Sequence, residues 1–362
     1  MQTLHLYTFV LLIAILYEFV AADVIPATET PAPALPAQNR PHRIVAVGDL
    51  HGDYENTMNV FKMAGLVDEN ESWAGGDYTT FVQTVFVWGS GRGDVLDRGN
   101  DTIKLYAMLE RLIGEAEEAG GKVIALLGNH ELMNLAGDWR YVLPSEKATF
   151  GSFDDRVDAF KPTGFIGRFL FERDLVAIVN TTVFCHGGIQ PIFAAHGINW
   201  LNEMTHAELL EYHSSHGTHG DPLGLFGGKG PTWYRGYVLS PEEEVCPLLM
   251  EALKWMDVSN SMCLTYWRWG FFNSGRVLLE TIGGGATRMV VGHTMQHNGR
   301  ILSRCDGRLI GIDVGITAVF GRHRAALEIV GDVVKEIYEG TTVEIKSEGR
   351  EWRRIRSMRE EL

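Results

Sequence analysis

Five short polar clusters in the sequence carry the residue types that hold metal ions. They are Gly48-Asp49-Leu50-His51-Gly52-Asp53, Gly93-Asp94-Val95-Leu96-Asp97-Arg98-Gly99, Gly128-Asn129-His130-Glu131, Cys185-His186-Gly187-Gly188 and Val291-Gly292-His293-Thr294. Together they offer aspartate and asparagine oxygens and histidine nitrogens, which are ligands that divalent transition metals prefer. The clusters therefore indicate metal-dependent chemistry, provided that the fold brings them together.

The glycines in these clusters have a physical purpose. A glycine beside an acid or a histidine lets the backbone turn sharply off a strand and approach a ligand closely. Taken singly, each cluster has an ordinary structural explanation, because Gly-Asp is a common turn and His-Gly-Gly can be a tight loop. Five clusters in order, each after an apolar segment, favour one shared site.

Apolar segments that precede the clusters are predicted to be strands. The predicted strands are Arg43–Val47, Thr79–Val87 and Lys122–Leu127. Helices are predicted between them, over 53–64 and 101–119. Strands that alternate with helices at this spacing predict a βαβαβ unit with a parallel sheet. Ligands bind at the carboxyl ends of such strands, which is where the clusters are found.

The rest of the chain extends this α/β pattern. A hairpin over 176–185 is predicted to turn at Asn180-Thr181, and helices are predicted over 199–214 and 247–257. Further strands are predicted at 289–291, 300–302, 309–312, 326–330, 333–338 and 342–345.

Composition sets outer bounds on the class of protein. The chain has 362 residues, of which 45% are hydrophobic, so it can bury a sizeable core as one large domain or two ordinary ones. Its net charge of −14 argues against nucleic acid as a partner, since that role needs a basic surface.

The two ends of the chain predict entry into the secretory pathway. Residues 1–22 are predicted to be a cleaved signal peptide, with a retained anchor as the alternative, and no stable membrane span is expected after cleavage. Residues 23–42 read as a proline-rich linker, 43–345 as the folded domain and 346–362 as a charged tail. The ending Arg359-Glu360-Glu361-Leu362 is similar to a Lys-Asp-Glu-Leu address, so the endoplasmic reticulum lumen is expected, with secretion as the alternative.

Four cysteines would then lie in an oxidising compartment. Cys185 sits in an apolar run and is expected to be a small buried side chain. Three pairings are open for four cysteines, and Cys246 with Cys263 is the pair we expect.

The motifs resemble those of the calcineurin-like metallophosphoesterases, and within them the phosphoprotein phosphatase branch. Gly-Asp-Leu-His-Gly-Asp (48–53), Gly-Asp-Val-Leu-Asp-Arg-Gly (93–99), Leu-Leu-Gly-Asn-His-Glu (126–131) and Gly-Ile-Asp-Val-Gly (311–315) are most similar to the Shewanella-like protein phosphatases. The likeness spans about 44–315, and the Ser-Ala-Pro-Asn-Tyr ending typical of eukaryotic Ser/Thr phosphatases is absent from the sequence. It implies a sandwich of two mixed β-sheets flanked by helices, around a βαβαβ metal-binding core.

The resemblance implies two metal ions, which could be Mn, Fe or Zn. Asp49 and His51 would hold the first ion, and Asp94 would bridge both. Asn129, His186 and His293 would complete the ligand set of the second ion. Asn129 is also expected to bind substrate. Two such ions lower the pKa of a shared water, so that a hydroxide attacks the phosphate in line.

The resemblance also implies roles for the remaining site residues. His130 would be the general acid, and Asp97 would orient it. Arg98 would bind phosphate oxygens, and Arg235 would be a second phosphate-binding arginine. An ordinary surface arginine beside aromatic residues is the alternative for Arg235. Asp313 is expected near the site, without an assigned role.

One segment departs from the family pattern. Val85 to Arg92 stands between Gln83-Thr84 and Gly93, where the family strand runs directly into Gly-Asp. It is either a real insertion or an artefact of gene prediction. A real insertion could displace Asp94 and Arg98, and a displacement of about 1 Å can cost on the order of a hundredfold in rate.

Three functions are therefore considered. The first is a metal-dependent phosphomonoesterase that acts on phosphoproteins, at phosphotyrosine or at phosphoserine and phosphothreonine. The second is a phosphoesterase for small molecules such as dinucleotide polyphosphates. The third is an inactive metal-binding lumenal protein that retains the fold. The sequence does not predict an oligomeric state.

Overall fold

The computed structural model describes residues 40–84, 97–256, 285–347 and 349. The chain divides into two compact units, Met1–Arg40 and Pro41–Leu362, and the second unit is described below. The predicted signal peptide, most of the predicted linker and the Arg359–Leu362 ending lie outside the described residues, as do Asp94 and the Val85–Arg92 segment. Those predictions remain predictions.

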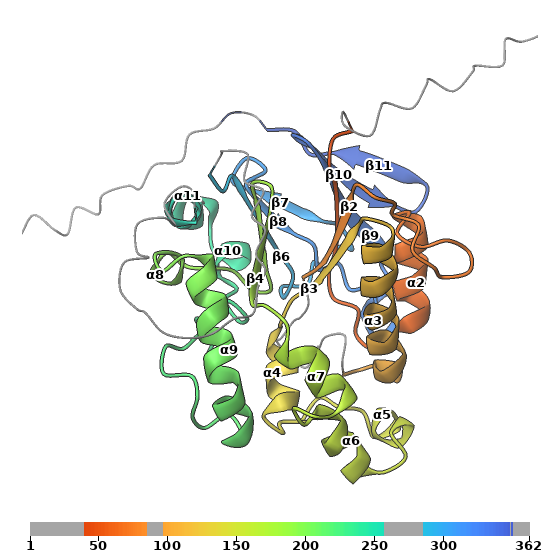
Figure 1. The fold of residues 1–362 in the computed structure, drawn as a ribbon. Coiled ribbons are helices and arrows are strands. Elements are labelled where there is room, and N and C mark those ends of the chain that lie inside the picture. Colours follow the sequence, from red (N-terminus) through yellow and green to blue (C-terminus); the bar gives the residue numbers. More distant parts are fainter. Residues whose placement is uncertain (1–39, 85–96, 257–284, 348, 350–362) are drawn as a thin grey trace, which may run out of the picture. The chain divides into compact units, whose positions relative to one another are not determined.

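Two mixed β-sheets form the centre of the described unit (Figure 1). The first sheet has the order β11-β10-β9-β1-β2-β3, with β1 parallel to β2 and β2 parallel to β3. Its strands are β1 (Arg43–Val47), β2 (Thr79–Gln83), β3 (Lys122–Ala125), β9 (Ala325–Val330), β10 (Val333–Tyr338) and β11 (Thr341–Glu344). The apolar side chains of β1 after Arg43 are buried, which explains the continuous hydrophobic run that predicts this strand.

The second sheet has the order β4-β5-β6-β8-β7. Its strands are β4 (Val176–Val179), β5 (Thr182–Cys185), β6 (Arg288–Val291), β7 (Leu302–Arg304) and β8 (Leu309–Gly311). β5, β6 and β8 run parallel, so their carboxyl ends point the same way. The β4–β5 hairpin turns at Asn180, whose φ of 54° is a conformation that asparagine tolerates.

Helices connect and cover these strands. They are α2 (Tyr54–Met63), α3 (Thr102–Glu118), α4 (Asn129–Leu135), α5 (Pro144–Thr149), α6 (Phe153–Phe160), α7 (Phe165–Phe171), α8 (Pro191–Ala194), α9 (Ile198–Ser214), α10 (Gly236–Leu239) and α11 (Glu242–Trp255), with a 3-10 turn at Ala318–Phe320. α2 begins after Asp53, whose carboxylate accepts a hydrogen bond from the Asn56 amide at 3.0 Å. No helix among the described residues is long and apolar enough to cross a membrane.

The predicted two-sheet α/β architecture is confirmed. The bounds of several elements need correction. Among the described residues, the strand expected over 79–87 ends at Gln83, and the strand expected over 122–127 ends at Ala125. The strand expected at 300–302 begins later, at Leu302, and the helix expected to start at 247 starts at Glu242. Pro247 lies inside α11 and does not begin it, because the three glutamates before it suit the first turn of a helix.

The predicted Cys246–Cys263 disulfide is wrong. Cys246 on α11 is bonded to Cys305, which lies in the tight turn between β7 and β8. The same contact is supported by Glu242, whose carboxylate accepts a hydrogen bond from the Cys305 amide at 2.7 Å. Cys185 is a buried free cysteine, as expected. The disulfide therefore joins α11 to the second sheet.

Removing this disulfide is expected to lower stability. Cys246 and Cys305 are 59 residues apart, so their bond restricts a long loop of the unfolded chain. A Cys246→Ser/Cys305→Ser variant should lose about 2–4 kcal/mol in the free energy of unfolding, measured by denaturant titration. Peptide mapping under non-reducing conditions should find the Cys246 and Cys305 peptides linked. A linked Cys246–Cys263 peptide would contradict this pairing.

Candidate active site

Loops from both sheets meet where their parallel strands end. Asp49 and His51 follow β1, and Asn129 and His130 open α4 after β3. From the second sheet, the loops after β5, β6 and β8 contribute the site residues His186, His293 and Asp313. All seven of these side chains are fully buried. The predicted clusters therefore converge, apart from Asp94, which lies outside the described residues.

Two glycines allow these loops to touch. A Cβ on Gly99 would overlap the carbonyl oxygen of Gly52, so the backbone at the end of the second cluster is in direct contact with the loop that follows β1. A Cβ on Gly292 would come within 2.6 Å of Asp49 Oδ1. Larger residues at either position would push the first cluster away from its neighbours.

Four site residues have a left-handed backbone. His51, Asp97, Arg98 and His293 have φ values of 59°, 63°, 67° and 63°. For any residue that carries a Cβ, this conformation is unfavourable by about 1 kcal/mol or more. Such backbone strain is concentrated at functional sites. The loops are therefore held in place by the surrounding fold and not by local preference.

A first group of possible metal ligands consists of Asp49, His51 and Asp313. One ligand atom from each residue lies within 4.8 Å of the others. Both ring nitrogens of His51 are buried and have no hydrogen-bond partner among the described residues. Burial and the neighbouring charges of His130 and Arg98 hold the pKa of His51 well below its ordinary value. A neutral imidazole beside two carboxylates is a suitable set of ligands for a divalent cation.

A second group consists of Asn129, His186 and His293. His186 Nε2 lies 2.8 Å from Asn129 Oδ1 and 2.9 Å from His293 Nδ1. Two backbone carbonyls fix the far sides of the rings, because His186 Nδ1 donates to Thr84 O at 3.3 Å and His293 Nε2 donates to Trp233 O at 2.9 Å. The facing atoms are then an amide oxygen and two imidazole nitrogens, a set that fits a metal ion.

His130 and Asp97 form a buried pair beside these groups. His130 Nδ1 lies 2.6 Å from Asp97 Oδ2, and both side chains are almost wholly inaccessible to solvent. Asn134 on α4 donates to the same carboxylate oxygen at 3.3 Å and to the His130 carbonyl at 3.0 Å. Burial raises the pKa of Asp97 to about 7. The short contact with Asp97 fixes the orientation of the His130 ring.

An ion pair that the sequence did not predict lies behind Asn134. Arg156 on α6 donates to the Asn134 side-chain oxygen at 2.8 Å and to Glu146 Oε2 at 2.9 Å. Arg156 and Glu146 are both fully buried. The guanidinium also lies 4.8 Å from the ring centre of Phe160. A continuous chain of hydrogen bonds thus runs from the buried ion pair to His130.

The two predicted phosphate-binding arginines border the site. The Arg98 guanidinium lies 5.3 Å from the centre of the Tyr141 ring, and that ring is 5.0 Å from the His130 ring. Arg235 is half-buried, and burial lowers its pKa to about 10 while the charges of Asp313 and Asp49 act in the opposite direction. Arg235 therefore remains charged at neutral pH and faces the first ligand group.

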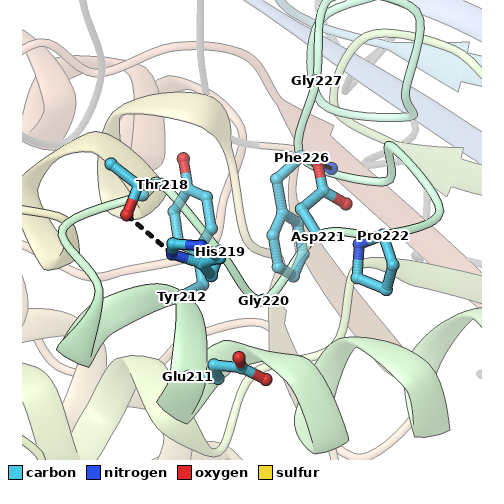
Figure 2. A pocket seen from close by; sticks show the side chains of 10 residues that line it. Glu211, Tyr212, Thr218, His219, Gly220, Asp221, Pro222, Phe226 and Gly227 are labelled. Atoms are coloured by element: carbon cyan, nitrogen blue, oxygen red, sulfur yellow. Dashed lines mark hydrogen bonds between the residues drawn. The ribbon is translucent and has the colours of Figure 1, made fainter.

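Two hollows lie near the site, and one of them includes Tyr141, whose ring is next to that of His130. One has a volume of about 470 Å³ and includes Tyr141 and Trp233 in its lining. The other, shown in Figure 2, has a volume of about 530 Å³ and includes Glu211 and Asp221. The two hollows share four lining residues, which are Tyr212, Gly217, Phe226 and Gly227. A surface for a ligand larger than phosphate thus adjoins the site.

This fold and site define a class, that of metal-dependent enzymes that cleave phosphate esters. The family model of the calcineurin-like phosphoesterases matches residues 42–251, and the chain belongs to this family. It is a hydrolase that acts on phosphate esters. The family resemblance predicted from the motifs is confirmed.

Relatives of this chain extend the match beyond the residues of the family model. The chain is 34% identical to an uncharacterized protein of Schizosaccharomyces pombe, over 84% of this chain and 83% of the relative. It is 31% identical to Shewanella-like protein phosphatase 2 of Arabidopsis thaliana, over 77% of this chain and 72% of that one. A similar solved structure is the cold-active protein-tyrosine phosphatase of a psychrophilic Shewanella species. Its TM-score is 0.64 at 24% identity, covering 84% of this chain and 80% of that one, and it supports the fold.

Proposed function

We propose that the protein is a phosphoprotein phosphatase with a dinuclear metal site. The observation that carries this proposal is the His130–Asp97 pair, with its 2.6 Å contact, beside two separate groups of residues that could hold a metal ion. The names of two relatives, both Shewanella-like protein phosphatases, support a phosphoprotein as the substrate. Asp94 would complete the ligand set as the bridging residue.

The residues of this chain would divide the work. When bound, two ions supply an activated water and neutralise charge on the phosphate. Arg98 and Arg235 would hold the phosphate oxygens, since a guanidinium fork matches their geometry. Because His130 Nδ1 is engaged by Asp97, the proton for the leaving oxygen would come from Nε2.

The proposal is tested with the purified mature protein supplied with Mn²⁺. Matched phosphotyrosine, phosphoserine and phosphothreonine peptides, a dinucleotide polyphosphate and p-nitrophenyl phosphate are offered as substrates. Hydrolysis of a phosphopeptide, lost on chelation and restored by Mn²⁺, is the expected result, and the ranking of peptides gives the residue preference. Turnover of the dinucleotide alone would replace the proposal with a small-molecule phosphoesterase. Bound metal without turnover of any substrate would mean an inactive protein.

The two hollows give a separate prediction about peptide selection. Glu211 is exposed on α9 and lines the second hollow together with Asp221, so this end of the surface is acidic. A Glu211→Lys variant should raise KM for phosphopeptides with nearby lysine or arginine about two- to tenfold, because it replaces attraction with repulsion. KM for p-nitrophenyl phosphate should not change.

The matched control for this prediction is Glu203→Lys. Glu203 is exposed on the same helix but lines neither hollow, so the same change in net charge occurs away from the proposed surface. Equal effects of both variants on basic peptides would mean that net charge, and not the hollow, sets the preference.

A further inference from the structure

Asp313 lies next to the first pair of ligands, although the family motifs give it no role. It follows β8 in the second sheet, whereas Asp49 and His51 follow β1 in the first. The three side chains are fully buried, and one ligand atom from each lies within 4.8 Å of the others. Two buried carboxylates are thus brought together from different sheets.

Two neighbouring buried carboxylates need positive charge nearby. Desolvation and mutual repulsion both oppose two anions in a buried place. Arg235 interacts electrostatically with Asp313 and with Asp49. A divalent cation held by both carboxylates would stabilise their negative charges further.

His51 gives an independent indication of a ligand. Its ring is fully buried, and neither nitrogen has a hydrogen-bond partner among the described residues. Leaving buried polar atoms without a partner costs on the order of 1–3 kcal/mol, so such atoms usually mark a bound water or ion. The nitrogen that belongs to the three-residue group lies within the same 4.8 Å as the two carboxylates.

We propose that Asp313 is a ligand of the same metal ion as Asp49 and His51. The proposal rests on the proposed metal dependence and adds a ligand beyond the set that the family motifs imply. Asp313 Oδ1 accepts a hydrogen bond from the Gly315 amide at 3.1 Å, which orients the carboxylate. Two carboxylate oxygens and one imidazole are ligands that a divalent ion such as Mn accepts.

A second explanation makes a different prediction. Asp313 could serve only to orient Arg235, in which case it would affect phosphate binding and not metal binding. Binding of Mn²⁺ in the absence of substrate distinguishes the two roles, because only a metal ligand would affect it. An Asp313→Asn variant keeps an oxygen for the Gly315 amide while it removes the negative charge.

The experiment measures Mn²⁺ binding to the metal-stripped full chain by calorimetry, with bound metal counted by elemental analysis. The Asp313→Asn variant should bind its first Mn²⁺ about 10- to 100-fold more weakly, and the Mn²⁺-induced rise in melting temperature should shrink. Asp313→Glu should recover part of the affinity. Asp332→Asn, the same change at an exposed turn residue, should bind Mn²⁺ like the wild type.

The outcomes distinguish this inference from the proposed function. Unchanged Mn²⁺ affinity in Asp313→Asn, with only a higher KM for substrate, would overturn the ligand role and support the orienting one. A lower melting temperature of the metal-free variant with a normal Mn²⁺-induced rise would show a structural role and would also overturn it. Failure of the wild type to bind Mn²⁺ would reject the metal-dependent function itself.

Discussion

Replacing His130 with asparagine should lower kcat for a phosphoserine peptide by on the order of 10²–10⁴-fold. Asparagine keeps a polar group that can bond to Asp97, but it cannot donate a proton to the leaving oxygen. Because His130 is not among the expected metal ligands, KM and bound metal should stay close to their wild-type values. Steady-state kinetics and elemental analysis of the same preparation measure all three quantities.

The leaving group provides a sharper test of the general-acid role. Nitrophenolate leaves without being protonated, whereas the serine alkoxide needs a proton. The loss caused by His130→Asn should therefore be much smaller with p-nitrophenyl phosphate than with the phosphoserine peptide. His297→Asn, at an exposed histidine, is the control and should leave both rates unchanged. An equal loss on both substrates would mean that His130 acts on binding or structure instead.

The convergence of the site could be predicted because it depends on local patterns. Each strand that precedes a cluster is a short apolar run, and Arg43–Val47 and the hairpin of Val176–Val179 with Thr182–Cys185 have the predicted bounds. Parallel pairing gathers the carboxyl ends of the strands within each sheet. Asn129 and His186, 57 residues apart, follow strands of different sheets, so their contact also depends on how the two sheets pack. Sequence patterns are enough to predict the position of a site when the strands and helices follow a known βαβ topology.

What the sequence did not reveal depends on contacts between distant segments. Cys305 is bonded to Cys246 because the β7–β8 turn lies beside α11 in the fold. No rule of cysteine spacing predicts that arrangement. Asp313 stands in a motif with no inherent sign of a metal ligand, and only its nearness to Asp49 and His51 suggests one. The helices α5, α6 and α7 are each eight residues or shorter, too brief for a clear periodic signal.

Because the short helices α5, α6 and α7 are not predicted from the sequence, the buried position of Arg156 on α6 is not predicted either. Charged residues are seldom fully buried unless paired, so nothing in the sequence marks this arginine as internal. The structure places it among Glu146, Asn134 and the ring of Phe160. Since Asn134 also donates to Asp97, the short helices position the His130–Asp97 pair from behind.

Replacing Arg156 with methionine should destabilise the protein by about 3–5 kcal/mol, because Glu146 would be left buried and unpaired. The variant should also lower kcat, since Asn134 would lose the donor that fixes its side-chain oxygen. Denaturant titration measures the free energy of unfolding, and kinetics at a temperature where the variant is folded measure kcat. Arg168→Met, at an exposed ion pair with Glu110, should change stability little.

A double variant separates stability from positioning. Arg156→Met with Glu146→Leu removes both buried charges, so much of the lost stability should return. Asn134 would still lack its donor, so kcat should remain below that of the wild type while KM stays similar. Recovery of both stability and kcat would show that the ion pair only supports folding. Recovery of stability alone is expected, because the hydrogen bonds from Arg156 through Asn134 to Asp97 hold the carboxylate that orients His130.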